Sequence, residues 1–475
     1  MSRIGAAEAT QVRRRGIHGL IQRSPDGMPL TVPGTLVVAF LVASGRWGSY
    51  LGFPRENLYL TDVLLVVSFA WTFLRYRHLL GSAARHSWRQ LSPILALVVW
   101  GVLRFATGPV SADAIRDVAP YAYLTVGTLA AVAVTPTAVR RSARVLFVAL
   151  VFHLLWVTLS AVLGDPFVGK APVLGGVIRV FELRPDFDGA MLAILAGTAL
   201  YAALCPDSAR APGRTALLAA LGLWASGAVL LLANRAAVLA LLTAYLVTVV
   251  RLLPQLRHLW QRWRGWVVAV GAVMLVLLAV IIPQTPTYQR LSGSGSFVQG
   301  TTAGTTAARQ AAWGLVLRYT NQTPERVAVG VGTGPDFLKA SGAWVHYQAV
   351  GHSIVRQPHN FALNTYARLG LVGVLLLAWL LGALSFKSLQ LLRSSGRSAA
   401  ELGWVLAWAT LFVTSLVGVI LEAPFGAIPF AWAAGRVLLW RPQSAPLLAD
   451  RTEPGVVSDV REPREGGPGT RRKCS

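Results

Sequence analysis

The sequence is poor in charge, above all in negative charge, and almost free of cysteine. Only 13% of the 475 residues are charged, with 20 Asp or Glu against 44 Lys or Arg. Soluble globular domains carry about 25% charged residues, so the composition argues against an ordinary soluble enzyme. It also excludes a coiled coil and an intrinsically disordered chain. With two cysteines, Cys205 and Cys474, a disulfide scaffold is excluded as well.

Apolar runs take the place of the missing charge. A helix that crosses a bilayer needs about 20 mostly apolar residues, and twelve stretches are long enough or nearly so. Lipid offers no hydrogen-bond partners, so each stretch is expected to be a helix. The prediction is an all-α, polytopic integral membrane protein with about twelve transmembrane helices. The stretches are Gly27–Gly45, Leu58–Leu74, Leu91–Ala106, Val118–Val139, Val145–Gly164, Gly189–Pro206, Thr215–Asn234, Ala236–Val250, Gly265–Gln289, Phe361–Phe386, Leu402–Leu421 and Ala423–Gly435.

The arginines between these stretches predict the orientation of the chain. If the N-terminus is cytoplasmic, the inner segments carry groups such as Arg13, Arg14 and Arg15, or Arg140 and Arg141, while the short outer loops carry far fewer. This asymmetry is the positive-inside rule. The net charge of +24 therefore indicates topology and attraction to anionic lipid, not nucleic acid. Both termini are predicted to be cytoplasmic.

The predicted spans divide the chain into five parts. Residues 1–29 form a cytoplasmic N-terminal segment, 30–283 hold transmembrane helices 1–9, and 284–360 form one large extracytoplasmic loop. Residues 361–440 hold helices 10–12. The tail 441–475 is rich in Pro, Gly and charge, which predicts disorder. Long loops of compact proteins are usually functional when ordered, so the large loop is where chemistry is expected.

Two pairs of residues stand out in that loop. Arg309 and Trp313 are four residues apart in a predicted helix and therefore share a face. His359 and Asn360 precede the next span, and Asn360 is predicted to cap that helix. A neutral histidine near pH 7 is a natural proton acceptor for a hydroxyl. The alternative for His359 is an interfacial residue that only anchors the helix end.

Further arginines stand at or in the membrane. Arg235 is the only charge between two spans that have almost no connecting loop. Arginine at membrane depth is costly and is a functional hypothesis by default, and its planar fork suits phosphate oxygens. The alternative is a snorkelling residue that marks the helix end. Arg368, two turns inside its span, either faces the same cavity or pairs with Glu422.

Other features have plainer interpretations. The glycines of 330–334 match no phosphate-binding pattern, and a tight turn is the preferred interpretation. The loop histidines fit no standard zinc spacing, so no metal is predicted. The outer loop 165–188, which holds Arg179 and Arg184, is either a solvated loop or part of the site. His153 is expected to be a packed core histidine, and Arg116 with Asp117 a local ion pair.

Taken together, these motifs resemble the O-antigen ligase and O-antigen polymerase family of bacterial polytopic membrane glycosyltransferases. The similarity spans roughly residues 179–384. The residues that carry it are Asn234-Arg235-Ala236 between two spans, Arg309 with Trp313, Gly330-Val331-Gly332, His359-Asn360, and Leu369-Gly370-Leu371-Val372-Gly373.

The resemblance implies a function and a place. The protein would transfer or polymerise a glycan from a polyprenyl-pyrophosphate-linked donor onto an acceptor hydroxyl, at the outer face of a bacterial cytoplasmic (inner) membrane. The donor lipid would lie between helices, and the acceptor would be a glycan, a lipid or a protein. No cofactor and no nucleic acid partner are expected. The rival hypothesis is a transporter or flippase for a lipid-linked or anionic solute.

It also implies roles for the residues. Arg235 and Arg309 would bind the pyrophosphate, with Arg184 or Arg179 assisting, so that arginines replace a metal ion in neutralising the leaving group. His359 would orient or deprotonate the acceptor hydroxyl. Trp313, Asn360 and Arg368 are expected to support the site.

Overall fold

A computed structural model gives the fold. It describes residues 32–53, 58–130, 136–205, 212–253, 302–349, 355–394 and 398–441. The described residues up to Trp440 form one compact unit. The predicted span Gly265–Gln289, the segment 1–29 and nearly all of the tail 441–475 lie outside the described residues.

The described chain is mostly helical, as the composition predicts. Its helices are α2 (Val32–Gly48), α3 (Leu60–Ala106), α4 (Ala112–Ala122), η2 (Tyr123–Thr125), α5 (Val126–Leu129), α6 (Pro136–Leu163), α7 (Asp165–Val168), α8 (Pro185–Leu204), α9 (Pro212–Leu231), α12 (Thr302–Thr320), α13 (Pro324–Val329), α14 (Phe337–Ala340), α15 (Trp344–Gln348), α16 (Phe361–Arg393), α17 (Ala399–Ser415), η5 (Ile420–Glu422) and α18 (Pro424–Leu438). A further helix runs from Arg235 to Leu253. Two antiparallel hairpins complete the list, β1 (Gly52–Phe53) with β2 (Leu58–Tyr59) and β3 (Val173–Leu174) with β4 (Ile178–Arg179).

Six of the described helices are long and apolar enough to cross a membrane, and three shorter helices are apolar too. These helices support the prediction of an all-α membrane protein. The number of twelve spans stays a prediction. The six are Ser87–Ala106, Val139–Leu163, Pro185–Leu204, Pro212–Leu231, Arg235–Leu253 and Phe361–Arg393, and the shorter three are Gly34–Gly48, Leu60–Leu74 and Ala399–Ser415.

The predicted span Val118–Val139 is not one straight helix in its described part. Helix α4 ends at Ala122 and is followed by the 3-10 turn η2 and the short α5. Pro120 lies inside α4 and cannot donate a backbone hydrogen bond. Thr125 and Thr128 donate their hydroxyls back to the carbonyls three residues earlier, each at 2.6 Å. Such side chain–backbone bonds compete with regular helix, so the break has a local cause.

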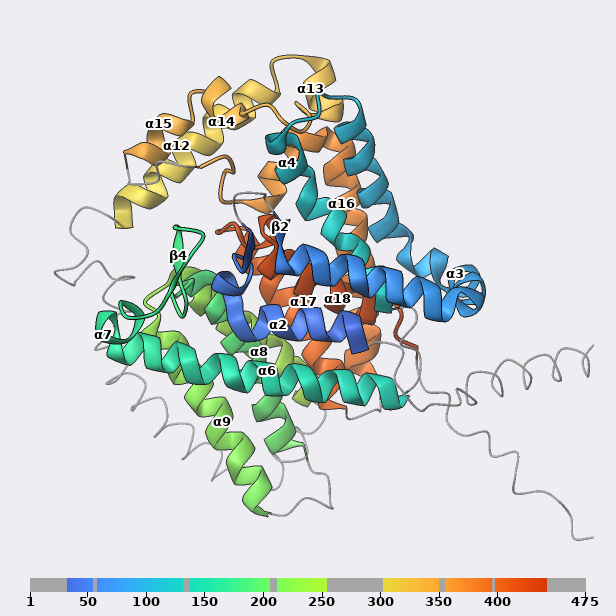
Figure 1. The fold of residues 1–475 in the computed structure, drawn as a ribbon, viewed down its shortest axis with the longest axis vertical. Helices are drawn as coiled ribbons and strands as arrows, with labels where there is room; N and C mark the ends of the chain where they lie inside the picture. The colour runs from blue at the N-terminus through green and yellow to red at the C-terminus, as the bar shows by residue number, and fades with distance from the viewer. Residues whose placement is uncertain are drawn as a thin grey trace, which may run out of the picture. The chain divides into compact units, whose positions relative to one another are not determined.

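Helix α8 lies in the middle of the bundle. It packs against α9, α17 and α6, and Figure 1 shows it behind α6, which runs alongside α2. Most of α8 is Ala, Gly or Leu and buried. Small side chains allow close helix approach in membranes. At Gly189 a methyl group would collide with the Cα and Cβ atoms of Ala237, so only glycine permits this contact between α8 and the helix Arg235–Leu253.

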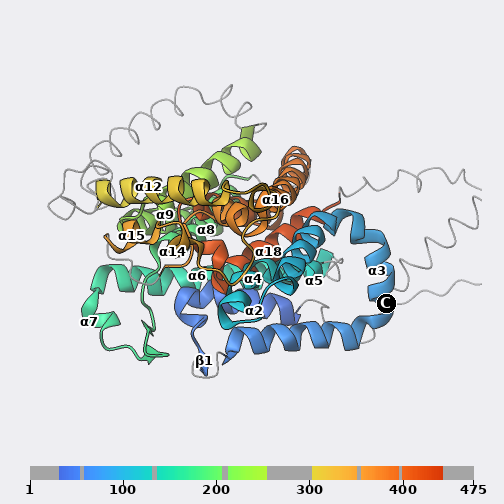
Figure 2. The same ribbon diagram turned by 90° about the horizontal axis from the view of Figure 1, so that it is seen from above.

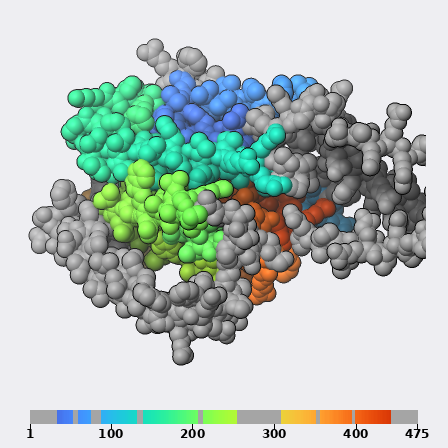
Figure 3. All heavy atoms as spheres, turned by 90° about the horizontal axis from the view of Figure 1, so that it is seen from below, coloured from blue at the N-terminus to red at the C-terminus, as the bar shows by residue number. Residues whose placement is uncertain are grey.

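Apolar side chains also cover the outside of the bundle. Figure 3 shows α6 and α9 next to each other on the face seen from below. Both helices expose large apolar residues, among them Val148, Phe152, Leu217 and Trp224. Exposed apolar patches of this kind mark interaction with lipid or another partner, and lipid is the partner for helices of membrane-spanning length.

Helix α3 accounts for two of the predicted spans at once. It runs for 47 residues and follows a wide arc in Figure 2. Its apolar ends, Leu60–Leu74 and Ser87–Ala106, therefore point in different directions. The described part of the large predicted loop forms α12 to α15, and α12, α14 and α15 gather around a small separate core that includes Val316, Phe337 and Tyr347.

Candidate active site

Helix α12 holds two predicted residues on one face. Arg309 donates from Nη1 to the carbonyl of Val417 at 2.9 Å, in the connection between α17 and α18. Trp313 donates from Nε1 to the carbonyl of Pro358 at 2.6 Å. Arg309 and Trp313 therefore lie on one face of α12, as their four-residue spacing predicts. This face links the residues just after α17 with the segment that carries His359.

Three predicted arginines lie within electrostatic reach of one another. The pKa of Arg309 is lowered, first by burial, and further by the positive charges of Arg184 and Arg235, while Tyr347 and Asp186 act in the opposite direction. The Nε atom of Arg309 is buried and has no hydrogen-bond partner among the described residues. A protein gathers like charges at a cost, and an anionic ligand removes that cost.

The chain places Arg184 and Arg235 at helix beginnings. Arg184 precedes α8 and forms an ion pair with Asp186, with Nε 2.8 Å from Oδ1. Arg235 opens its helix four residues after the end of α9, so the connection is as short as predicted. The Asn234 side chain caps that helix by accepting from the backbone N–H of Ala236 at 2.8 Å.

These helix beginnings meet in space. The contact between Gly189 and Ala237 joins the first turns of α8 and the helix Arg235–Leu253. Phe187 in α8 and Phe425 in α18 pack edge to face, with ring centroids 5.1 Å apart. Backbone N–H groups at helix beginnings carry partial positive charge and favour anions. The arginines and the helix ends therefore add to the same positive potential.

Contacts from Tyr347 and Trp313 fix the position of His359 and of the residue before it. The ring of His359 stacks on Tyr347 with centroids 5.4 Å apart and an interplanar angle of 20°. Tyr347 donates its hydroxyl to the carbonyl of Pro358 at 2.7 Å, the same carbonyl that Trp313 binds. Asn360 caps α16 by accepting from the N–H of Leu363 at 3.0 Å, as predicted. Burial raises the pKa of Tyr347, so this ring is a neutral platform.

The glycine run 330–334 is more than the turn that was predicted. Helix α16 is kinked at Gly370, whose φ is 66°, and Gly330 crosses the kink so closely that a Cβ on either glycine would collide with backbone. The kink releases carbonyls that the helix no longer satisfies, and N–H groups from elsewhere take them. The pairs are Val331 N with Ala367 O (2.8 Å), Gly332 N with Arg368 O (3.0 Å) and Trp100 Nε1 with Leu369 O (3.0 Å).

Arg368 does not pair with Glu422, one of the two alternatives that the sequence left open. Its Nη1 lies 2.6 Å from Oδ2 of Asp117, and both side chains are buried. Its guanidinium also lies over the ring of Phe337, 4.9 Å from the centroid. The predicted local pair of Arg116 with Asp117 is therefore wrong, because the fold supplies Asp117 with a partner far away in sequence.

Glu422 is the residue of the site that sequence reasoning treated only as a possible partner. Both carboxylate oxygens are buried without a hydrogen-bond partner among the described residues. Burial raises the pKa of Glu422 to about 8, although Arg368 and Arg184 oppose the shift. In the sequence, the only feature that pointed to Glu422 was a single acidic residue between two apolar stretches.

Two further predicted residues have ordinary structural partners. Arg179 is exposed and donates from Nη1 to the carbonyls of Gly169 and Ala171 in its own loop, which favours Arg184 as the assisting arginine. His153 is fully buried, with Nε2 3.4 Å from Oδ1 of Asp188, in line with the packed histidine that was expected. Among the described residues, no group of three or more His, Cys, Asp or Glu side chains is arranged to hold a metal.

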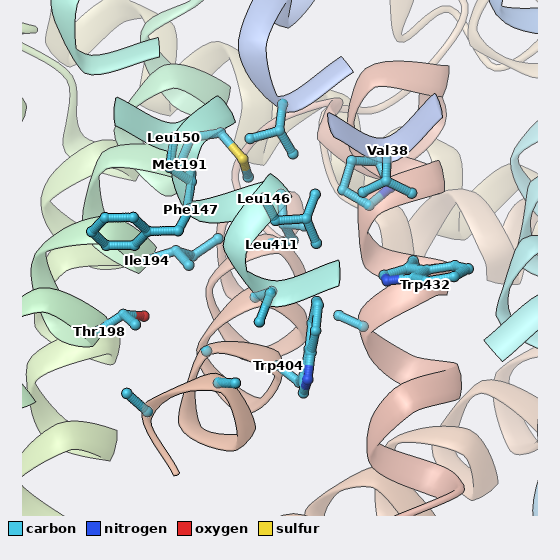
Figure 4. Close-up of a pocket in the computed structure, with 18 residues that line it drawn as sticks. Val38, Leu146, Phe147, Leu150, Met191, Ile194, Thr198, Trp404, Leu411 and Trp432 are labelled. Carbon is cyan, nitrogen blue, oxygen red and sulfur yellow. The ribbon is translucent and has the colours of Figure 1, made fainter. Parts of the chain in front are cut away.

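A separate apolar pocket lies between α2, α6, α8, α17 and α18 (Figure 4). Its lining includes Phe147, Met191, Thr198, Trp404 and Trp432, and none of the residues that line it is charged. Along α8, Thr198 lies about 20 Å from Arg184, the residue that precedes the helix. The pocket therefore suits an apolar chain and not a phosphate.

The sequence model of the O-antigen ligase family matches residues 218–378. The chain carries an O-antigen ligase family domain. The matched range holds every motif on which the resemblance rests, from Asn234-Arg235-Ala236 to the Gly370 kink. No curated protein matches the chain. The family match and the apolar helices support a membrane protein with a general role in glycan transfer.

Proposed function

We propose that this protein transfers or polymerises a glycan from a polyprenyl-diphosphate-linked donor onto an acceptor hydroxyl, at the outer face of the bacterial cytoplasmic membrane. The observation that carries the proposal is the meeting of Arg184, Arg235 and Arg309 near the beginnings of two helices, beside the segment that presents His359. A diphosphate is the anion whose charge and shape suit several guanidinium groups at once.

The arginines would stabilise the leaving group. As the bond between the anomeric carbon and the diphosphate oxygen breaks, negative charge grows on the departing polyprenyl diphosphate. Fixed guanidinium groups and helix beginnings that face this charge lower the barrier. Arg309 is suited to the task because burial strengthens its field. Its Nε has no partner in the described part of the chain and is available to donate.

His359 would act on the other substrate. Its imidazole would accept the proton of the acceptor hydroxyl while the hydroxyl oxygen attacks the anomeric carbon. Direct attack of this kind inverts the anomeric configuration. In this scheme no metal ion or cofactor takes part. The apolar pocket of Figure 4 supports a place for a lipid chain between helices.

The test is release of free polyprenyl diphosphate by the protein in liposomes that contain lipid-linked oligosaccharide from the source bacterium. His359→Ala and Arg309→Gln should each lower the rate about 100-fold or more, in line with the loss of one charge-stabilising donor. Arg318→Gln is the matched control, because Arg318 lies on the same helix and is exposed. It should leave the rate unchanged.

The outcomes separate the hypotheses. Longer glycan product would indicate a polymerase, and glycan joined to a different acceptor would indicate a ligase. If the wild-type protein moved lipid-linked oligosaccharide across the bilayer without breaking it, the transporter hypothesis would replace the proposal. Equal rates for Arg309→Gln and Arg318→Gln would remove the diphosphate-binding role of Arg309.

A further inference from the structure

His359 has a backbone conformation that must be enforced. Its φ is 55°, in the left-handed region that non-glycine residues seldom adopt. Such a conformation costs on the order of 1–3 kcal/mol and persists only when the surroundings fix it. On the C-terminal side of His359, the cap that Asn360 forms on α16 restrains the backbone. The carbonyl of Pro358 is fixed by Trp313 and Tyr347. The upstream side needs a restraint of its own.

Arg356, three residues before His359, supplies that restraint. Its Nη2 donates to the carbonyl of Gly334 at 2.8 Å and to Oδ2 of Asp117 at 3.2 Å. Its Nη1 forms an ion pair with Asp113 at 3.0 Å. The Arg356 side chain is only 13% exposed, and that of Asp117 is fully buried. Largely buried, charge-assisted arginine contacts of this kind are stronger than surface ion pairs.

Asp117 ties this restraint to the rest of the site. The same Oδ2 atom also accepts from Nη1 of Arg368 at 2.6 Å and from the N–H of Gly334 at 3.0 Å. One carboxylate oxygen therefore joins α4, the glycine run, the kinked half of α16 and Arg356. Helix α4 lies outside the residues that match the family domain.

We propose that Arg356, bound to Asp117, is a positioning residue for His359. It lies away from the reacting atoms and holds the segment 356–360 so that the imidazole stays stacked on Tyr347. Losing the contact lets His359 relax out of the left-handed region and withdraw from the acceptor hydroxyl. The role rests on the proposed function of His359, and a misplacement of about 1 Å lowers a rate by roughly 100-fold.

The experiment compares Arg356→Gln with wild type in liposomes. The variant should release polyprenyl diphosphate about 10- to 100-fold more slowly. Its KM for the lipid-linked donor should not change, nor should its binding stoichiometry for added polyprenyl diphosphate. Arg356→Lys should recover part of the rate, since an ammonium keeps one of the contacts. Arg326→Gln is the control. Arg326 comes from the same loop, with its guanidinium 4.4 Å from the ring centroid of Tyr319, and its loss should not change the rate.

A second readout reports on His359 directly. Diethyl pyrocarbonate modifies accessible imidazoles, and mass spectrometry gives the rate for each histidine. In Arg356→Gln the modification of His359 should speed up several-fold relative to His346. Asp113→Asn removes only the most exposed partner of Arg356 and should give a smaller change in the same direction, which keeps the test valid if the glutamine variant fails to fold.

The results have distinct meanings. Unchanged rate and unchanged His359 modification in Arg356→Gln would overturn the positioning role, as would a loss of donor binding in step with the rate. If the wild-type protein releases no polyprenyl diphosphate, the proposed function fails. The relative modification rates of His359 and His346 still decide whether Arg356 holds the segment.

Discussion

At the scale of single residues, the distribution of counter-ions separates binding arginines from structural ones. Arg368 has a buried carboxylate at 2.6 Å and Arg179 has loop carbonyls. Arg309 instead has one backbone carbonyl and two neighbouring arginines. Among the residues that the structure describes, Arg309 forms no ion pair with a carboxylate. A buried cation of this kind is a candidate for binding a charged ligand.

Glu422 gives a prediction about pH. Its pKa in the fold is about 8, above that of an unfolded glutamate, near 4.3. Between these values the folded state binds the extra proton, so the free energy of unfolding falls as pH rises. Glu422→Gln removes this dependence. In detergent micelles its unfolding temperature should exceed that of wild type by an amount that grows from pH 5 to pH 9.

Glu325→Gln is the matched control for this prediction, because Glu325 is exposed in the first turn of α13. It should follow the wild-type curve at every pH. A constant difference between Glu422→Gln and wild type across the pH range would show that the carboxyl of Glu422 ionises normally in the fold.

At the scale of elements, two close approaches between backbones build the site. One is the crossing of Gly330 with the kink at Gly370, and the other is the contact of Gly189 with Ala237. Both need glycine because another side chain has no room. The kink also releases carbonyls for the loop to bind. The site therefore joins the loop to the membrane helices through backbone groups.

Gly370→Ala should be strongly harmful. The residue has a φ of 66°, and a Cβ there would collide with the carbonyl oxygen of Ala328. We expect a loss of about 1–3 kcal/mol or more from strain alone, seen as a lower unfolding temperature, together with loss of glycan transfer. Gly382→Ala in the same helix meets no atom within 4 Å and should be neutral or slightly stabilising. Equal unfolding temperatures for the two variants would contradict the kink.

At the scale of the whole molecule, the distribution of charge predicts the side of the membrane on which the site lies. The beginnings of α8 and α18 meet at the site, and the positive-inside rule predicts that this side is the exterior. The arginine-rich connections would then face the cytoplasm. This orientation is open to direct measurement.

Thiol labelling checks the predicted topology. Lys339→Cys, at a side chain that is 65% exposed, should react with a membrane-impermeant maleimide in intact spheroplasts. The native Cys474 should react only after the membrane is permeabilised, while Cys205 is buried. A Cys474→Ser background isolates the first signal. Labelling of Cys474 in intact spheroplasts would place the C-terminus outside and reverse the predicted orientation.

Local patterns explain what the sequence predicted well. Apolar length predicts where helices can cross a membrane, and nine of the twelve predicted stretches overlap the long or shorter apolar helices of the described chain. The spacing of Arg309 and Trp313, the Asn360 cap and the short connection before Arg235 are also local, since each depends on residues within a few positions. They could be predicted for that reason.

The predictions that failed or stayed open depend on contacts between distant parts of the chain. Asp117 was assigned to its neighbour Arg116, yet it pairs with Arg368, more than two hundred positions away. The glycine run was assigned to a turn because nothing nearby shows that α16 kinks against it. The role of Glu422 depends on burial by several helices, which composition does not report.

By itself, the sequence determined the class of the protein, most of its apolar helices and the residue types available for chemistry. These follow from hydropathy, charge and short-range spacing. Only the tertiary structure decided which arginines meet, which acid neutralises Arg368, and how His359 is held in a left-handed conformation. The physical reason is that electrostatic and steric partners are chosen by distance in space, and a bundle of long helices brings together residues that the sequence keeps far apart.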